Sequence, residues 1–193
     1  MRTLNWILAG AWAAFVITWF GAAWRNKLTV RRSMLPGRPT IRSSMAPCAG
    51  LVVVVVLLHY LLPRLPERLA APPPSLARGV LGCILCVIGV AYAIWARLSL
   101  GSNWGLPMSQ KERPELVTAG PYARVRHPIY TGVILALLGT AVVTGTGALL
   151  VALAFVGYFL ASASREERHL RSEFPEAFRA YQARTKRFIP YLF

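Results

Sequence analysis

The sequence predicts an all-α integral membrane protein with five transmembrane helices, the N-terminus outside and the C-terminus inside. Of the 193 residues, 55% are hydrophobic and only 15% are charged, whereas about 25% of the residues in a soluble domain are charged. The apolar residues form long uncharged runs, and the cations lie between the runs. With alternating sides, 18 of the 22 Lys and Arg residues fall on inside segments, as the positive-inside rule requires.

The formal net charge of +15 would indicate a nucleic-acid partner in a soluble protein. Here the cations are confined to loops between apolar runs, where they set the topology and contact anionic lipid headgroups. The chain has no Asp, which removes the Asp-rich magnesium sites of many lipid-phosphate enzymes. Cys48, Cys83 and Cys86 all lie in apolar runs, where packing is the usual role of cysteine. We therefore expect membrane lipids as partners, and neither nucleic acid nor a metal.

The first region, residues 1–96, is expected to hold three transmembrane helices, at 4–24, 46–63 and 77–96. A signal peptide is the alternative for the first run, but only Arg2 is charged before it and no small-residue cleavage site precedes the basic loop. We interpret it as a retained span. Gly79, Gly82 and Gly89 in the third run suggest a helix face that another helix approaches closely.

The second region, residues 97–193, is expected to hold the functional site and has three parts: a connector at 97–127, a membrane hairpin at 128–164 and a cytosolic tail at 165–193. The uncharged run of 37 residues from Pro128 to Ser164 is long enough for two short helices that turn at Gly145. Apolar residues at three- and four-residue steps in the tail predict two short helices that meet near Phe174.

Polar residues gather where the predicted hairpin reaches the inside face. Arg126 and His127 come directly before its first helix, and Glu166 and Glu167 follow its second. An antiparallel hairpin places the start of one helix beside the end of the other, so we expect His127 and Glu166 to be neighbours. Polar groups near bilayer depth are usually functional. Simple anchoring at the interface is the alternative, and we favour it only for Arg124.

The stretch Arg126-His127-Pro128-Ile129-Tyr130-Thr131-Gly132 resembles the RHPxYxG motif of the isoprenylcysteine carboxyl methyltransferase family. Further elements of that family recur in order, over roughly residues 97–190: Leu116-Val117, Gly120-Pro121-Tyr122, Glu166-Glu167-x-x-Leu170, Phe174, Tyr181, Arg187 and Pro190. The chain looks like a prokaryotic-type member, and the family is related to phospholipid N-methyltransferases. Its members are multi-pass membrane enzymes that use S-adenosylmethionine to methylate a lipid-borne group.

The resemblance implies S-adenosylmethionine as the cofactor, in a cytosolic pocket formed by the hairpin, the connector before it and short C-terminal helices. The cofactor-binding residues that it implies are Glu115, Leu116, Val117, Tyr122, His127, Pro128, Ile129, Tyr130 and Glu166. The catalytic residues are expected to be His127, Glu166 and Arg126. Aromatic faces suit a sulfonium or an adenine, and a carboxylate suits an amine or ribose hydroxyls. The glycine-rich strand-to-helix turn of soluble nucleotide-binding folds is not found at this site.

The expected acceptor is a lipid or prenylated substrate from the bilayer, methylated at the cytosolic side of a membrane, with the bacterial inner membrane as the expected location. Ser162, Arg165 and Trp104 are the expected substrate-binding residues. The prenylcysteine enzymes of the family carry an Arg where this chain has Ser162, which favours a phenolic or quinone-like hydroxyl over an isoprenylcysteine carboxylate. A carboxylate nucleophile needs no base, whereas a phenol needs one, and His127 or Glu166 could serve. Phospholipid N-methylation and a non-catalytic membrane protein of the same fold remain the alternatives.

Overall fold

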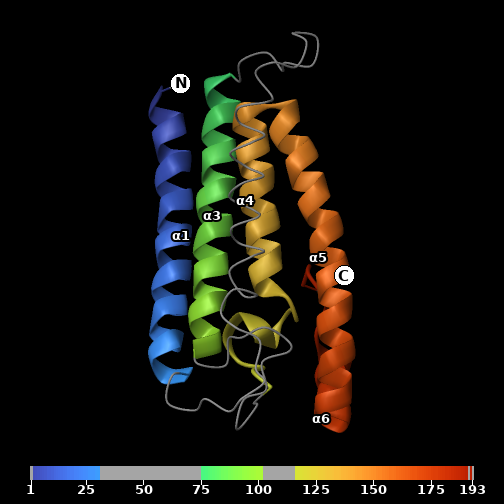
Figure 1. Cartoon of the computed structure of the whole chain (residues 1–193). Helices are drawn as coiled ribbons and strands as arrows, with labels where there is room; N and C mark the ends of the chain where they lie inside the picture. The colour runs from blue at the N-terminus through green and yellow to red at the C-terminus, as the bar shows by residue number, and fades with distance from the viewer. Residues whose placement is uncertain (1, 31–74, 102–115, 191, 193) are drawn as a thin grey trace.

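The structure is a computed structural model in which residues 2–30, 75–101, 116–190 and 192 are described. Figure 1 shows a bundle of long helices that run roughly side by side. Its elements are α1 (Arg2–Val30), α3 (Leu76–Leu100), the short 3-10 helix η4 (Gly120–Ala123), α4 (Pro128–Thr144), α5 (Thr146–Glu173) and α6 (Pro175–Arg184). The predicted helix at 46–63 lies outside the described residues.

Three of these helices are long and apolar enough to cross a membrane: α1 over Arg2–Gly21, α3 and α5. The 17 residues of α4 are also apolar but fewer than a typical span needs. The all-helical, membrane-spanning class predicted from the sequence is therefore confirmed. Five spans and their orientation stay predictions.

The centre of the bundle is a close crossing of α3 and α4 (Figure 1). A Cβ atom added at Gly89 would lie 2.4 Å from the backbone nitrogen of Ala136, and one added at Gly132 would lie 2.6 Å from the carbonyl oxygen of Gly89. Backbones this close leave room only for hydrogen atoms at these positions. The closely approached face predicted from the glycines of α3 is confirmed, and it fixes where α4 begins relative to α3.

The helix α5 follows α4 after the turn at Gly145, where φ is 100°. It then continues without a break past Ser164 to Glu173, and α6 begins at Pro175. The predicted junction at Phe174 is confirmed, but the first of the two expected short tail helices is the end of α5. The stretch from Tyr158 to Phe174 contains no Gly or Pro, so nothing in it interrupts the helix where the charged residues begin.

The chain after α6 returns to the start of α4. Residues 185–188, which we call the C-terminal strap, run parallel to residues 124–127 through a bridge between Val125 and Lys186. The backbone amide of Arg126 donates to the carbonyl of Lys186 at 2.8 Å, and that of His127 donates to the carbonyl of Arg187 at 3.0 Å. The strap thus holds the two residues that precede α4.

Candidate active site

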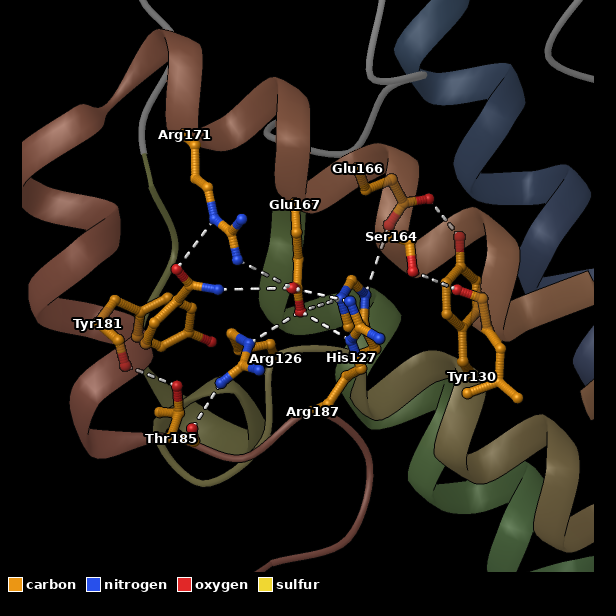
Figure 2. A network of polar contacts seen from close by, with 12 residues as sticks. Arg126, His127, Tyr130, Ser164, Glu166, Glu167, Arg171, Tyr181, Thr185 and Arg187 are labelled. Atoms are coloured by element: carbon orange, nitrogen blue, oxygen red, sulfur yellow. Dashed lines mark hydrogen bonds and ion pairs between the residues drawn. The ribbon is translucent and has the colours of Figure 1, made fainter. Parts of the chain in front are cut away.

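His127 occupies the N-cap position of α4, with φ −125° and ψ 58°. Its side chain is only 6% exposed, and its two ring nitrogens face two carboxylates. Nδ1 lies 3.4 Å from Oε2 of Glu166, and Nε2 lies 3.2 Å from Oε1 of Glu167. The predicted proximity of His127 to Glu166 is therefore present, and Figure 2 shows the ring between the two glutamates.

Glu167 is the centre of the polar network in Figure 2. Its side chain is 4% exposed. Arg126 donates to it through Nε at 2.9 Å, and Arg187 donates through Nε at 3.2 Å and Nη2 at 3.0 Å. Gln182 of α6 adds a contact at 3.4 Å. Buried carboxylates are stable only when they are paired in this way.

Sequence reasoning assigned no role to Glu167 or Arg187, although both stand in the motifs quoted above. The partners of Glu167 come from the residues before α4, from α6 and from the C-terminal strap. Only their order was visible in the sequence, and no spacing rule links residues so far apart. The available signal was the pair of consecutive acids, Glu166 and Glu167. Consecutive residues of a helix point about 100° apart, so the two carboxylates had to face different surroundings.

Glu166 faces the other side of His127 and is more open than Glu167, with a side chain 28% exposed. It accepts a hydrogen bond from the hydroxyl of Tyr130 on α4. The Tyr130 ring stacks on the His127 ring at 5.5 Å between centroids and on the Phe159 ring of α5 at 4.5 Å. A partly exposed carboxylate and an aromatic column therefore lie side by side.

Tyr181 ties α6 to the residues before α4. Its hydroxyl donates to the carbonyl of Tyr122 at 2.7 Å, and Thr185 donates to the carbonyl of Tyr181 at 2.6 Å. Burial raises the pKa of Tyr181 above its usual range, so this phenol stays protonated as a donor. Burial, with the nearby Tyr181 and Glu166, likewise raises the pKa of Tyr122.

Two opposing effects act on the pKa of His127. Burial lowers it, but hydrogen bonds to Glu166 and Glu167 and the charges of both carboxylates outweigh burial and raise the pKa above its ordinary value. His127 therefore keeps its proton to a higher pH than an exposed histidine does.

Arg126 was expected to be catalytic. Its guanidinium is engaged on two sides, since Nε binds Glu167 and Nη1 donates to the carbonyl of Thr185. The side chain is 13% exposed. Its observed contacts are with Glu167 and with the backbone of Thr185, and a catalytic role for it stays a prediction.

The other expected site residues are dispersed. Ser162 is buried one turn before Glu166, and Arg165 donates to its hydroxyl at 3.4 Å. Pro128 is buried as the first residue of α4, and Ile129 packs against the core. Leu116 and Val117 are half-buried in the described part of the connector. Trp104 and Glu115 lie outside the described residues. Within the described ranges, no group of three or more His, Cys, Asp or Glu residues could hold a metal ion.

Comparison with known proteins gives a consistent result. The sequence model of a family described as phospholipid methyltransferase matches residues 77–177, which is more than half of the chain. A solved structure of the eukaryotic intramembrane Ras methyltransferase ICMT (isoprenylcysteine carboxyl methyltransferase) matches with a TM-score of 0.54 and 20% identity, over 96% of this chain and 68% of that one. At this identity the match shows a shared fold.

Three curated relatives are similar over part of their length. The cobalt-zinc-cadmium resistance protein CzcN of Cupriavidus metallidurans is 36% identical over 122 residues, which cover 62% of this chain and 51% of that protein. The nickel-cobalt-cadmium resistance protein NccN of Alcaligenes xylosoxydans xylosoxydans is 34% identical over 116 residues, 59% of this chain and 49% of that protein. Methanethiol S-methyltransferase 2 of Bradyrhizobium diazoefficiens is 40% identical over 72 residues, 37% and 27% respectively. The chain thus spans about half the length of the first two.

Proposed function

Because the chain belongs to the phospholipid methyltransferase family, we propose that it is an S-adenosylmethionine-dependent methyltransferase that acts at a membrane on an acceptor reached from the bilayer. The observation that carries this proposal is the cluster at the start of α4, where buried His127 stands between Glu166 and Glu167. Its motifs are the ones on which the resemblance to isoprenylcysteine carboxyl methyltransferases rests. We further propose that the cluster faces the cytosol, as the distribution of Lys and Arg suggests.

The described residues suit the cofactor chemically. When bound, S-adenosylmethionine supplies a methyl group on a sulfonium cation. The partly exposed carboxylate of Glu166 suits its amine or its ribose hydroxyls. The faces of Tyr130 and Phe159 suit its cation or its adenine. We propose these three residues as the described part of the cofactor site, with Leu116 and Val117 of the connector beside them.

We assign different roles to the two glutamates. Glu166 has open surface and two orienting donors, the Tyr130 hydroxyl and His127 Nδ1, so it is the one that meets ligands. Glu167 is buried and fully engaged by Arg126 and Arg187, so it holds the site together. A carboxylate fixed by two donors loses little freedom on binding, which is how a preorganised site favours its ligand.

The charges around the site favour a neutral acceptor over a carboxylate. Arg126 and Arg187 could have paired with an acceptor carboxylate, but both bind Glu167. Ser162 stands one turn before Glu166, and Arg165 contacts its hydroxyl. We therefore propose a hydroxyl or thiol acceptor in place of an isoprenylcysteine carboxylate. The name of the methanethiol S-methyltransferase relative supports the thiol.

Phospholipid N-methylation is the second candidate, and the description of the matching family favours it. Its acceptor is an amine at the headgroup, which would also approach Glu166 without needing a cation. The two candidates differ in their labelled products.

Calorimetry of the detergent-purified protein with S-adenosylmethionine tests the cofactor. Glu166→Gln should weaken binding about 10- to 100-fold, since a hydrogen bond to a charged group is worth about 1.5–3 kcal/mol. Glu173→Gln is the matched control on the same helix, because Glu173 pairs with His169 on the exposed surface. No binding at millimolar cofactor would overturn the proposal, and equal losses in both variants would overturn the assignment of Glu166.

Transfer of labelled methyl groups in native membranes tests the acceptor. A labelled apolar hydroxyl or thiol compound is the expected product. Labelled choline-type headgroups would instead show phospholipid N-methylation and overturn the proposal of a hydroxyl or thiol acceptor. If the protein binds the cofactor but labels no lipid or small-molecule fraction, the chain is a non-catalytic member of the family.

A further inference from the structure

Each ring nitrogen of His127 faces a carboxylate oxygen. Nδ1 faces Glu166 at 3.4 Å and Nε2 faces Glu167 at 3.2 Å. A neutral imidazole has one N–H donor and one lone pair, so one of its nitrogens would point a lone pair at a carboxylate oxygen. Only the doubly protonated imidazolium donates to both.

The proton between His127 and Glu167 belongs to the histidine. Arg126 and Arg187 both donate to Glu167, and their charges keep this carboxylate ionised. An ionised carboxylate only accepts, so Nε2 must carry the hydrogen.

The proton between His127 and Glu166 follows from the second neighbour of Glu166. Tyr130 donates its hydroxyl to Oε1 of Glu166, and His127 faces Oε2. With Tyr130 as a donor on one oxygen and an imidazolium on the other, Glu166 is placed as a carboxylate that accepts from both.

The groups that face the His127 ring from the packed elements are all accounted for among the described residues. The residues before α4 supply Arg126, and α4 supplies Tyr130. The helix α5 supplies Glu166 and Glu167, and also Arg171, whose Nη2 lies 3.9 Å from Oε2 of Glu167. The C-terminal strap supplies Arg187, which reaches the ring through Glu167, and Phe188, whose ring lies 5.6 Å away. The arginines of this cluster contact Glu167, so among the described contacts the imidazolium is the cation that faces Glu166.

We propose that Glu167 is a positioning residue that holds His127 as a doubly protonated imidazolium, so that His127 is a fixed cation beside Glu166 and not a base. Sequence reasoning left His127 and Glu166 as equal candidates for a base. The geometry leaves Glu166 as the carboxylate that can take a proton from a bound hydroxyl or thiol, breaking that O–H or S–H bond and forming an O–H bond on Glu166. This last consequence rests on the proposed function, whereas the protonation of His127 does not.

Glu167→Gln separates charge from shape. The amide oxygen can still accept from Arg126 or Arg187, and the amide N–H₂ can turn towards Nε2 of His127. The ring could then accept at Nε2 and donate at Nδ1, which is a neutral tautomer. We therefore expect His127 to titrate at lower pH in this variant than in the wild type.

Nitrogen-15 NMR spectra of histidine-labelled protein in detergent or nanodiscs report the protonation of each ring nitrogen directly. The chain has three histidines, and the signal that disappears in His127→Gln identifies the ring. The expected result is that both ring nitrogens of His127 are protonated at pH 7.5 in the wild type and in Glu173→Gln, and that one loses its proton in Glu167→Gln. A singly protonated His127 in the wild type at pH 7.5 overturns the inference, as does identical titration of wild type and Glu167→Gln.

Calorimetry against pH supplies a second readout that a purely structural role of Glu167 would not move. The affinity of Glu167→Gln for S-adenosylmethionine should fall several-fold as the pH rises and recover towards wild type as His127 is protonated at low pH. A pH-independent loss would mean that Glu167 only stabilises the fold. The spectra need no cofactor, so a failure to bind S-adenosylmethionine would count against the proposed function and leave the inference on His127 standing.

Discussion

Arg187 grips Glu167 with two nitrogens, Nε at 3.2 Å and Nη2 at 3.0 Å. The arginine belongs to the C-terminal strap and the glutamate to α5, so this pair connects the strap to the second helix of the hairpin. Its geometry is the fork that a guanidinium makes with a carboxylate and that an ammonium cannot reproduce. Removing Arg187 leaves the buried carboxylate of Glu167 with one charged partner fewer.

Arg187→Ala should lower the free energy of unfolding by about 2–3 kcal/mol, because Glu167 would lose one of its charged partners while staying buried. Arg187→Lys keeps the charge without the fork and should lie between the alanine variant and the wild type. Thermal unfolding in detergent is the measurement, with Arg179→Ala as the control on the exposed surface of α6. A stability of Arg187→Ala equal to that of Arg179→Ala would show that the pair contributes nothing.

His127 should make the stability of the protein depend on pH. Its pKa is raised in the folded state above the ordinary value of 6.5, so the folded protein binds this proton more tightly than the unfolded chain does. The stabilisation is complete below the ordinary value and is lost as the pH rises through the raised pKa. Subtracting the unfolding temperatures of His127→Gln from those of the wild type, between pH 5 and pH 10, isolates this contribution. A difference that grows with rising pH would contradict the raised pKa.

Tyr181→Phe should cost about 1–3 kcal/mol of unfolding free energy. The substitution leaves the buried ring in place and removes the hydroxyl that donates to the carbonyl of Tyr122. That carbonyl would then lose a partner inside the protein. Tyr158→Phe makes the same chemical change on a ring that is 44% exposed, and it should change the stability by less than about 0.5 kcal/mol. Equal effects of the two substitutions would refute the role of the buried hydroxyl.

Gly89→Ala tests the contact between α3 and α4. The new Cβ would lie 2.4 Å from the backbone nitrogen of Ala136, so the two helices would have to move apart, at a cost of about 1–3 kcal/mol or more. Gly157→Ala is the matched control, since a Cβ there meets no atom within 4 Å and alanine favours helix. We expect the control to be neutral or slightly more stable in denaturant or thermal unfolding. A neutral Gly89→Ala would mean that the helices are not in close contact.

The prediction of His127 and Glu166 as neighbours succeeded because it needed only one local rule. A run of apolar residues with a glycine turn in the middle folds back on itself, and this alone brings the two ends of the hairpin together. The prediction of a separate short helix at the start of the tail failed for a local reason too. No residue between Ser164 and Phe174 ends a helix, and the change from apolar to charged residues marks a change of solvent, not of secondary structure.

The contacts that Arg126 makes could not be predicted from the sequence, and its catalytic role stays a prediction. Seven glutamates and 22 Lys and Arg residues offer many pairings, and nothing local says which of them form. Arg126 binds Glu167 because the same packing that buries Phe178 of α6 brings the C-terminal strap alongside residues 124–127.

The sequence by itself determined that this chain is a helical membrane protein, where its described apolar helices lie, and that His127 and Glu166 meet at one end of the hairpin. Periodicity and apolar run length are properties of neighbouring residues, so they can be read along the chain. Tertiary structure alone decided which glutamate is open and which is buried, and that Arg126 and Arg187 serve the buried one. That division depends on contacts at 20 and 41 residues of separation, which form only when α5, α6 and the strap pack together.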